Sequence, residues 1–66
     1  MKIKFNGESI EFSDSCLFEL LDQNDLSNKS GIAVAINNTV VPKSLWQEAE
    51  IKENDEVLVI TAAAGG

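Results

Sequence analysis

Residues 56–66 read Glu-Val-Leu-Val-Ile-Thr-Ala-Ala-Ala-Gly-Gly, and the fold is best deduced outward from this stretch. Its residues 57–60 are consecutively apolar, which is typical of a central strand or of a strand with a binding face. Three alanines and two glycines follow, so the chain becomes slim after the strand. Because glycine has no Cβ, a Gly65-Gly66 end fits a narrow enzyme channel. The only reactive group that such an end offers is the carboxylate of Gly66.

The beginning of the chain alternates between apolar and polar residues, as a half-buried strand does. Ile3 and Phe5 precede the pair Asn6-Gly7, and Ile10 and Phe12 continue the alternation after it. Asn-Gly tolerates positive φ at both positions of a type I′ turn and is a strong signal for a hairpin. We therefore expect residues 2–12 to form an antiparallel hairpin.

A short amphipathic helix is expected next. Ser15 is the preferred N-cap, because its hydroxyl can accept a hydrogen bond from a first-turn N–H group. One helical face then carries Cys16, Leu17, Leu20 and Leu21 at the i, i+3, i+4 spacing. On this face Cys16 is interpreted as a small buried hydrophobe rather than as a reactive thiol. The helix should fade by Asn24-Asp25, where a polar loop begins.

The second half of the chain predicts another hairpin. Residues 32–36 alternate large apolar residues with alanines, and residues 39–41 form a short return strand after the turn Asn37-Asn38. Pro42 ends this strand because it has no N–H for the sheet ladder. A short helical turn should then place Trp46 against the core, before the last strand at residues 56–61.

The expected order is strand, strand, helix, strand, strand, helical turn, strand. This order describes an α+β fold of the β-grasp (ubiquitin-like) type, a mixed sheet of about five strands with one main helix packed across it. The last strand lies beside the first. We expect a domain at residues 1–61 and a flexible tail at residues 62–66 that ends in Gly-Gly.

Composition narrows the classes of function. The 66 residues include one cysteine and no histidine, so the chain can form no internal disulfide and offers no Cys/His zinc site. A net charge of −6 argues against nucleic-acid binding, which requires a basic face. No apolar stretch is long enough to span a bilayer, and we expect a cytosolic protein that is not an enzyme.

Several segments together resemble the ThiS family, the small sulfur carriers of thiamine thiazole synthesis. The matching segments are Asn6-Gly7, Ser-Cys-Leu-Phe-Glu-Leu-Leu at 15–21, Ala-Ile-Asn-Asn-Thr-Val-Val-Pro-Lys at 35–43, Trp46, Asp55-Glu56-Val57 and Gly65-Gly66. MoaD-like carriers for molybdopterin tend to have prolines before the terminal glycines, where this chain has Ala62, Ala63 and Ala64. Two positions depart from the family pattern: Asn54 replaces a frequent glycine, and Cys16 replaces an aliphatic residue.

The resemblance implies a site and a set of partners. A ThiF-like adenylyltransferase would use ATP and Mg²⁺ to adenylate Gly66, and sulfur from a cysteine desulfurase would convert it to a thiocarboxylate. A ThiG-like thiazole synthase would then accept the sulfur. The chain itself would bind no cofactor or metal, and Gly65, Ala64 and Ala63 would let the tail thread into the partner. Six extended residues, from Thr61 to Gly66, reach about 20 Å at ~3.3 Å per residue.

Docking also needs a surface, and strand alternation nominates one on the sheet face opposite the helix. The predicted docking patch consists of Ala33, Ala35, Leu58 and Ile60. An exposed apolar patch on a small acidic protein indicates an interaction site, unless the segment from Pro42 to Glu53 covers it. Exposed acids such as Glu50, Glu53, Asp55 and Glu56 are a second candidate for contact with basic partner residues.

Three alternatives to the thiazole carrier remain open at this point. A MoaD-like carrier would share the chemistry of the tail and differ in its acceptor enzyme. A ubiquitin-like modifier would instead join Gly66 to lysines through an amide bond. A plain binding module would have an inert tail, and deletion of Gly66 would then change nothing.

Overall fold

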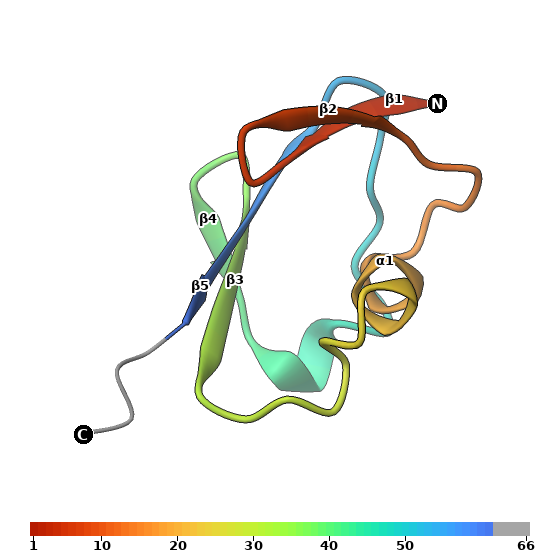
Figure 1. Ribbon diagram of the computed structural model, residues 1–66. Helices are drawn as coiled ribbons and strands as arrows, with labels where there is room; N and C mark the ends of the chain where they lie inside the picture. The colour runs from red at the N-terminus through yellow and green to blue at the C-terminus, as the bar shows by residue number, and fades with distance from the viewer. Residues whose placement is uncertain (62–66) are drawn as a thin grey trace.

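A computed structural model describes residues 1–61, and the predicted tail at 62–66 lies outside the described residues. Five strands form one sheet in the order β2-β1-β5-β3-β4, and α1 packs across one face of it (Figure 1). The elements are β1 (Lys2–Phe5), β2 (Glu8–Glu11), α1 (Leu17–Gln23), β3 (Ile32–Ile36), β4 (Thr39–Val41), the 3₁₀ turn η1 (Lys43–Leu45) and β5 (Glu56–Thr61). The expected α+β architecture is confirmed.

The first hairpin forms at the predicted turn. Asn6 and Gly7 have φ values of 52° and 85°, the left-handed conformation that a type I′ turn requires. β1 and β2 pair antiparallel, with Lys2 opposite Glu11 and Phe5 opposite Glu8. The second hairpin uses the same chemistry, because Asn37 and Asn38 have φ values of 50° and 70° between β3 and β4.

The last strand occupies the middle of the sheet, as its apolar sequence predicts. β5 runs parallel to β1 and antiparallel to β3, so strands cover both of its edges. Asn6 attaches the first hairpin to it: the Asn6 N–H donates to the carbonyl of Val57 at 2.9 Å, and the Val59 N–H donates to Asn6 Oδ1 at 2.8 Å.

The core lies between the sheet and α1. The buried residues of this core cluster are Ile3, Phe12, Leu17, Leu20, Leu21, Val34, Trp46, Ile51 and Val57. Trp46 is 2% exposed, and its indole N–H donates to the carbonyl of Val41 at 2.9 Å. The predicted placement of Trp46 in the core is therefore confirmed.

The predicted N-cap is wrong. Cys16, not Ser15, is the N-cap residue of α1, and no side chain caps the helix. Long-range pairing explains the difference: Cys16 is extended and forms an antiparallel bridge with Glu50, and the Ser15 carbonyl accepts a hydrogen bond from the Ile51 N–H at 2.7 Å. Cys16 is consequently outside the helix and half-buried, rather than fully buried on its apolar face.

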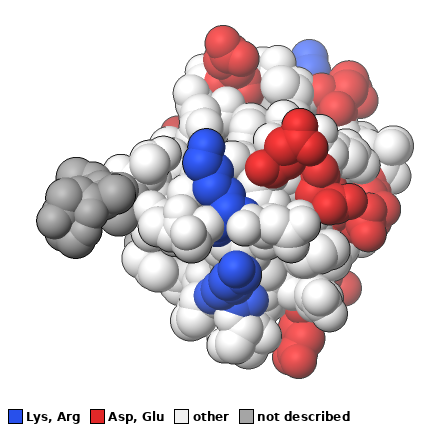
Figure 2. Space-filling model, turned by 60° about the horizontal axis from the view of Figure 1, so that its bottom comes forward, with Lys and Arg blue, Asp and Glu red and all other residues white. Residues whose placement is uncertain are grey.

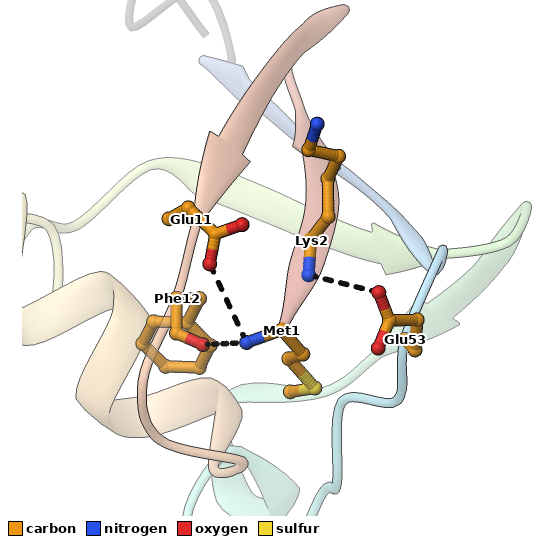
Figure 3. A network of polar contacts seen from close by, with 5 residues as sticks. All are labelled: Met1, Lys2, Glu11, Phe12 and Glu53. Atoms are coloured by element: carbon orange, nitrogen blue, oxygen red, sulfur yellow. Dashed lines mark hydrogen bonds and ion pairs between the residues drawn. The ribbon is translucent and has the colours of Figure 1, made fainter.

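The start of the chain is anchored by polar contacts (Figure 3). The Met1 ammonium donates to the carbonyl of Phe12 at 2.8 Å and lies 3.7 Å from a Glu11 carboxylate oxygen. The Lys2 N–H donates to Glu53 Oε2 at 3.3 Å. These contacts join the two ends of the first hairpin to each other and to the segment before β5.

Candidate functional site

The proposed sulfur-carrying end lies outside the described residues. Gly66 and the predicted threading residues Gly65, Ala64 and Ala63 all follow residue 61. The structure describes the point from which they depart: β5 ends at Thr61, which is exposed, and the preceding Ile60 is 58% exposed. Thr61 is level with Ile32, the first residue of the neighbouring strand β3, so β5 ends at the edge of the sheet where β3 begins (Figure 1).

Strand pairing brings the predicted docking patch together. Ala33 lies opposite Ile60, and Ala35 lies opposite Leu58. Because alternate strand residues point to opposite faces and Val34 and Val57 are buried in the core, these four side chains share the outer face of the sheet. We call the face that is turned away from α1 the outer face.

The four patch residues differ in exposure. Ala33 and Ile60 are exposed, Leu58 is half-buried, and Ala35 is buried with 9% exposure. Ala35 lies in the third strand between Val40 and Leu58, its directly paired neighbours. Directly opposite side chains approach within about 5 Å, so the two larger residues shield the small methyl group between them.

Val40 extends the apolar area beyond the predicted patch. It is 66% exposed, the largest exposure among the described large apolar residues, and it pairs directly with Ala35. The sequence alone does not reveal this exposure, because Val40 and Val41 are consecutive valines and the apolar pattern cannot tell which of them points toward the core. Only the register of the β3–β4 pair tells which of the two valines faces outward.

The segment between β4 and β5 does not cover the outer face. Its backbone bonds to the helix region: the Leu17 N–H donates to Ala49, and the Phe18 N–H donates to Trp46. Figure 1 shows this segment running beside α1, on the opposite side of the sheet from the outer face. Among the described residues the patch therefore has no cover from that segment.

The acidic candidates divide into two kinds. Glu53 and Asp55 are engaged within the fold, since Glu53 accepts from the Lys2 N–H and Asp55 accepts from the Lys52 N–H and from the Asn37 amide. The carboxylates of Glu50 and Glu56 are exposed and accept no hydrogen bond from the described residues. In Figure 2 acidic side chains lie along the top and right of the face shown and at its bottom, while the basic side chains near the middle stand in a largely uncharged area.

The Cys16 thiol contacts backbone carbonyl groups rather than an acidic or basic side chain. Its Sγ donates to the carbonyl oxygens of Gln47 at 3.5 Å and Trp46 at 3.8 Å. Within residues 1–61 there is no group of three or more His, Cys, Asp or Glu side chains close enough to hold a metal ion. No helix in this part of the chain has both the length and the apolar character needed to cross a membrane.

The family model for the ThiS family matches residues 3–66, which is almost the whole chain. The chain belongs to the ThiS family. Membership identifies it as a small sulfur carrier rather than an enzyme, as expected from its composition. The family match extends through the terminal glycines, Gly65 and Gly66.

Two curated relatives are similar over their whole or nearly whole length. The sulfur carrier protein ThiS of Escherichia coli (strain K12) is 33% identical over 67 residues, covering 100% of both chains. An uncharacterized protein of Porphyra purpurea, ycf40, is 32% identical over 66 residues, covering 100% of this chain and 93% of the relative.

Solved structures support the fold of this ThiS family member. The crystal structure of a thiamine biosynthesis protein (ThiS) from Geobacter metallireducens matches with a TM-score of 0.85, 22% identity and full coverage of both chains. A solution structure of a thiamine biosynthesis protein from the same organism matches with a TM-score of 0.75 and 22% identity, covering 100% of this chain and 88% of that one. These likenesses confirm the β-grasp fold.

Proposed function

We propose that this chain carries sulfur for the thiazole of thiamine, as a thiocarboxylate on Gly66. The observation that supports this role most strongly is the ThiS family match, which runs through residue 66. The curated relative whose name states the activity, the sulfur carrier of Escherichia coli, aligns end to end with this chain.

The proposed chemistry begins with activation, because a carboxylate is a poor electrophile. A ThiF-like adenylyltransferase joins the Gly66 carboxylate to AMP from ATP, with Mg²⁺, and releases pyrophosphate. A persulfide sulfur from a cysteine desulfurase then displaces AMP. Cleavage of the resulting acyl disulfide by a thiol leaves the thiocarboxylate. The ATP and Mg²⁺ sites belong to the partner in this proposal, and all partners act in the cytosol.

The next step of the proposal is delivery of sulfur to a ThiG-like thiazole synthase. The body of the carrier remains outside the acceptor while the slim tail enters it. The outer face supplies the docking surface, since it combines exposed apolar side chains with the strand that leads into the tail. Ile60 contributes most directly, because it is exposed and stands one residue before Thr61.

A transfer assay tests the function. The chain is incubated with ³⁵S-cysteine, cysteine desulfurase, ATP, Mg²⁺ and the adenylyltransferase, and then with either of two acceptor enzymes together with the carbon substrates of that enzyme. We expect label in the thiazole product with thiazole synthase and none in molybdopterin with a molybdopterin synthase large subunit. The opposite pattern would identify a MoaD-like carrier. Lysine-linked adducts in place of transfer would identify a modifier.

The outer face can be tested by substitution. Leu58→Asp and Ile60→Asp should each weaken binding to the adenylyltransferase about tenfold, because each places a charge in an apolar contact. Ser9→Asp is the matched control, since Ser9 is exposed on β2 at the edge of the sheet. Binding is measured by calorimetry and folding by thermal unfolding. Unchanged affinity in both folded variants would remove the patch from the docking surface.

A further inference from the structure

A second apolar feature lies at the free edge of the sheet. A groove of about 390 Å³ runs along β4 (Thr39–Val41), and its other lining residues are Pro42, Leu45, Glu48 and Ala49. We call it the edge groove. Leu45 is 46% exposed although it is apolar. β4 pairs only with β3, so its other edge has no strand partner among the described residues.

The edge groove lies near the departure point of the tail. β4 and β5 are both antiparallel to β3, so they run in the same direction and end at the same end of the sheet (Figure 1). Val41, Val34 and Val59 are in register across the three strands, and Val59 is two residues before Thr61. The groove therefore lies at the same end of the sheet as Thr61, with β3 between β4 and β5.

The edge groove has one charged residue beside its apolar lining. Glu48 is the only charged residue that lines it, and Glu48 is exposed. Lys43 and Lys52 are the basic residues nearest to Glu48 in sequence, and neither forms an ion pair with it; the Lys43 ammonium lies 5.9 Å from the centroid of the Trp46 ring instead. Within residues 1–61 the only ion pair joins Met1 to Glu11. The Glu48 carboxylate thus stands beside an apolar groove without an internal cation.

We propose that the edge groove binds an extended apolar segment, containing a Lys or Arg residue, of the enzyme that activates the Gly66 carboxylate. The segment lies along the edge of β4 that no strand covers among the described residues. Its contact is made mainly through side chains, because Pro42 has no N–H and the Val41 carbonyl already accepts the Trp46 indole N–H. Its apolar side chains cover Val40 and Leu45, and its cation pairs with Glu48. The net charge of −6 favours approach of such a basic segment.

This inference rests on the proposed function and adds a source of selectivity to it. A Gly-Gly end has no side chains, so it cannot by itself distinguish one glycine-tailed carrier from another. The groove presents side chains and a strand edge close to that end. Specificity then comes from the body of the carrier, while reactivity comes from its terminal carboxylate.

The test compares binding of groove variants to the ThiF-like adenylyltransferase by calorimetry at low and moderate salt. Leu45→Asp should weaken binding about tenfold, because it introduces a charge into an apolar contact. Glu48→Lys should weaken it by a similar factor, more strongly at low salt, since it turns attraction into repulsion. Glu8→Lys on β2, at the opposite edge of the sheet, is the matched control and should change affinity less than about threefold.

Milder substitutions provide a second measurement if an aspartate or lysine disturbs folding. Leu45→Ala removes apolar contact area, and Glu48→Gln keeps the size of the side chain while it removes the charge. Glu48→Gln should also flatten the salt dependence of binding, an effect that a purely structural role would not produce. Sulfur loading of every variant is followed by intact mass alongside binding.

The outcomes separate this inference from the proposed function. A wild-type chain that binds and gains sulfur, with groove variants of unchanged affinity, would overturn the inference and leave the carrier role in place. A wild-type chain that neither binds nor gains sulfur would overturn both. If the chain alone forms dimers that Leu45→Asp dissociates, the groove belongs to a second copy, and the inference is again overturned.

Discussion

At the scale of single residues, Asn6 fixes the corner where the first hairpin meets the central strand. It adopts a φ of 52°, which few side chains tolerate, and its Oδ1 accepts the Val59 N–H at 2.8 Å. Asn38 adopts a similar φ of 70° in the second hairpin, but no side-chain hydrogen bond of Asn38 occurs within residues 1–61. Two asparagines in similar turns therefore have different structural roles.

This difference predicts different costs of substitution. Asn6→Gly keeps the turn conformation and loses the hydrogen bond, so it should reduce the free energy of unfolding by about 1 kcal/mol. Asn6→Ala loses both and should cost about 2 kcal/mol. Asn38→Gly, the control, should stay within about 0.5 kcal/mol of the wild type. Urea unfolding measures all three, and equal losses for Asn6→Gly and Asn38→Gly would contradict the assignment.

At the scale of elements, the segment from η1 to Ile51 connects the sheet to the helix. Trp46 donates its indole N–H to Val41 at the end of β4, and its own carbonyl accepts the Phe18 N–H of α1. The Ala49 carbonyl accepts the Leu17 N–H at the start of the helix. This irregular segment thus supplies hydrogen-bond acceptors for N–H groups in the first turn of α1, which have no partner within the helix.

Trp46→Phe tests this connection. The ring and most of the packing remain, while the indole N–H that bonds to Val41 is lost, so the free energy of unfolding should fall by about 1–2 kcal/mol. Leu45→Ala at the neighbouring position is the control and should cost less, because Leu45 is 46% exposed. Thermal unfolding checks both. A larger loss for Leu45→Ala than for Trp46→Phe would argue against the anchoring role.

Elements with local causes could be predicted from the sequence. Asn6-Gly7 and Asn37-Asn38 specify their turns through their own conformational preferences, and the apolar run at 57–60 indicates a central strand. The start of α1 could not be predicted, because the bridge between Cys16 and Glu50 links residues far apart in the chain. A preference for Ser15 as an N-cap is worth about 1 kcal/mol, which tertiary pairing readily overrides.

Part of the candidate site could likewise be predicted from the sequence, and part of it could not. Strand alternation placed Ala33, Leu58 and Ile60 on one face without knowledge of the register. The burial of Ala35 and the exposure of Val40 required that register, since both follow from the pairing of β4 with β3. The edge groove is lined by β4, by Leu45 of η1 and by Glu48 and Ala49 after it, and no pattern in the sequence indicates that the chain folds back so that these residues face β4.

At the scale of the whole molecule, the stability of the fold depends on its net charge and its small size. The net charge of −6 is spread over 66 residues, and a chain of this length buries only about 60% of its unfolded surface. The one ion pair within residues 1–61 involves Glu11, whose side chain is 75% exposed. Repulsion among carboxylates is therefore opposed mainly by the apolar core.

Salt should consequently stabilise this protein. Raising the NaCl concentration from about 0.01 M to 0.15 M shortens the Debye length from roughly 30 Å to 8 Å and screens the repulsion. The unfolding temperature at constant pH should rise over this range. The double variant Glu8→Gln/Glu50→Gln, which has a net charge closer to zero, should show a smaller rise. A fall in unfolding temperature with salt would show that attractive pairs dominate instead.

The central claim is that sulfur is carried on the terminal carboxylate of Gly66, and intact-mass analysis tests it most directly. The chain is incubated with ATP, Mg²⁺, the adenylyltransferase, cysteine desulfurase and cysteine, and a chain lacking Gly66 is treated in parallel. We predict a mass gain equal to the exchange of one oxygen for sulfur, localised to Gly66 by fragmentation and absent from the shortened chain. An unchanged mass with an enzyme set that loads another carrier, or a gain located on Cys16, would contradict the account.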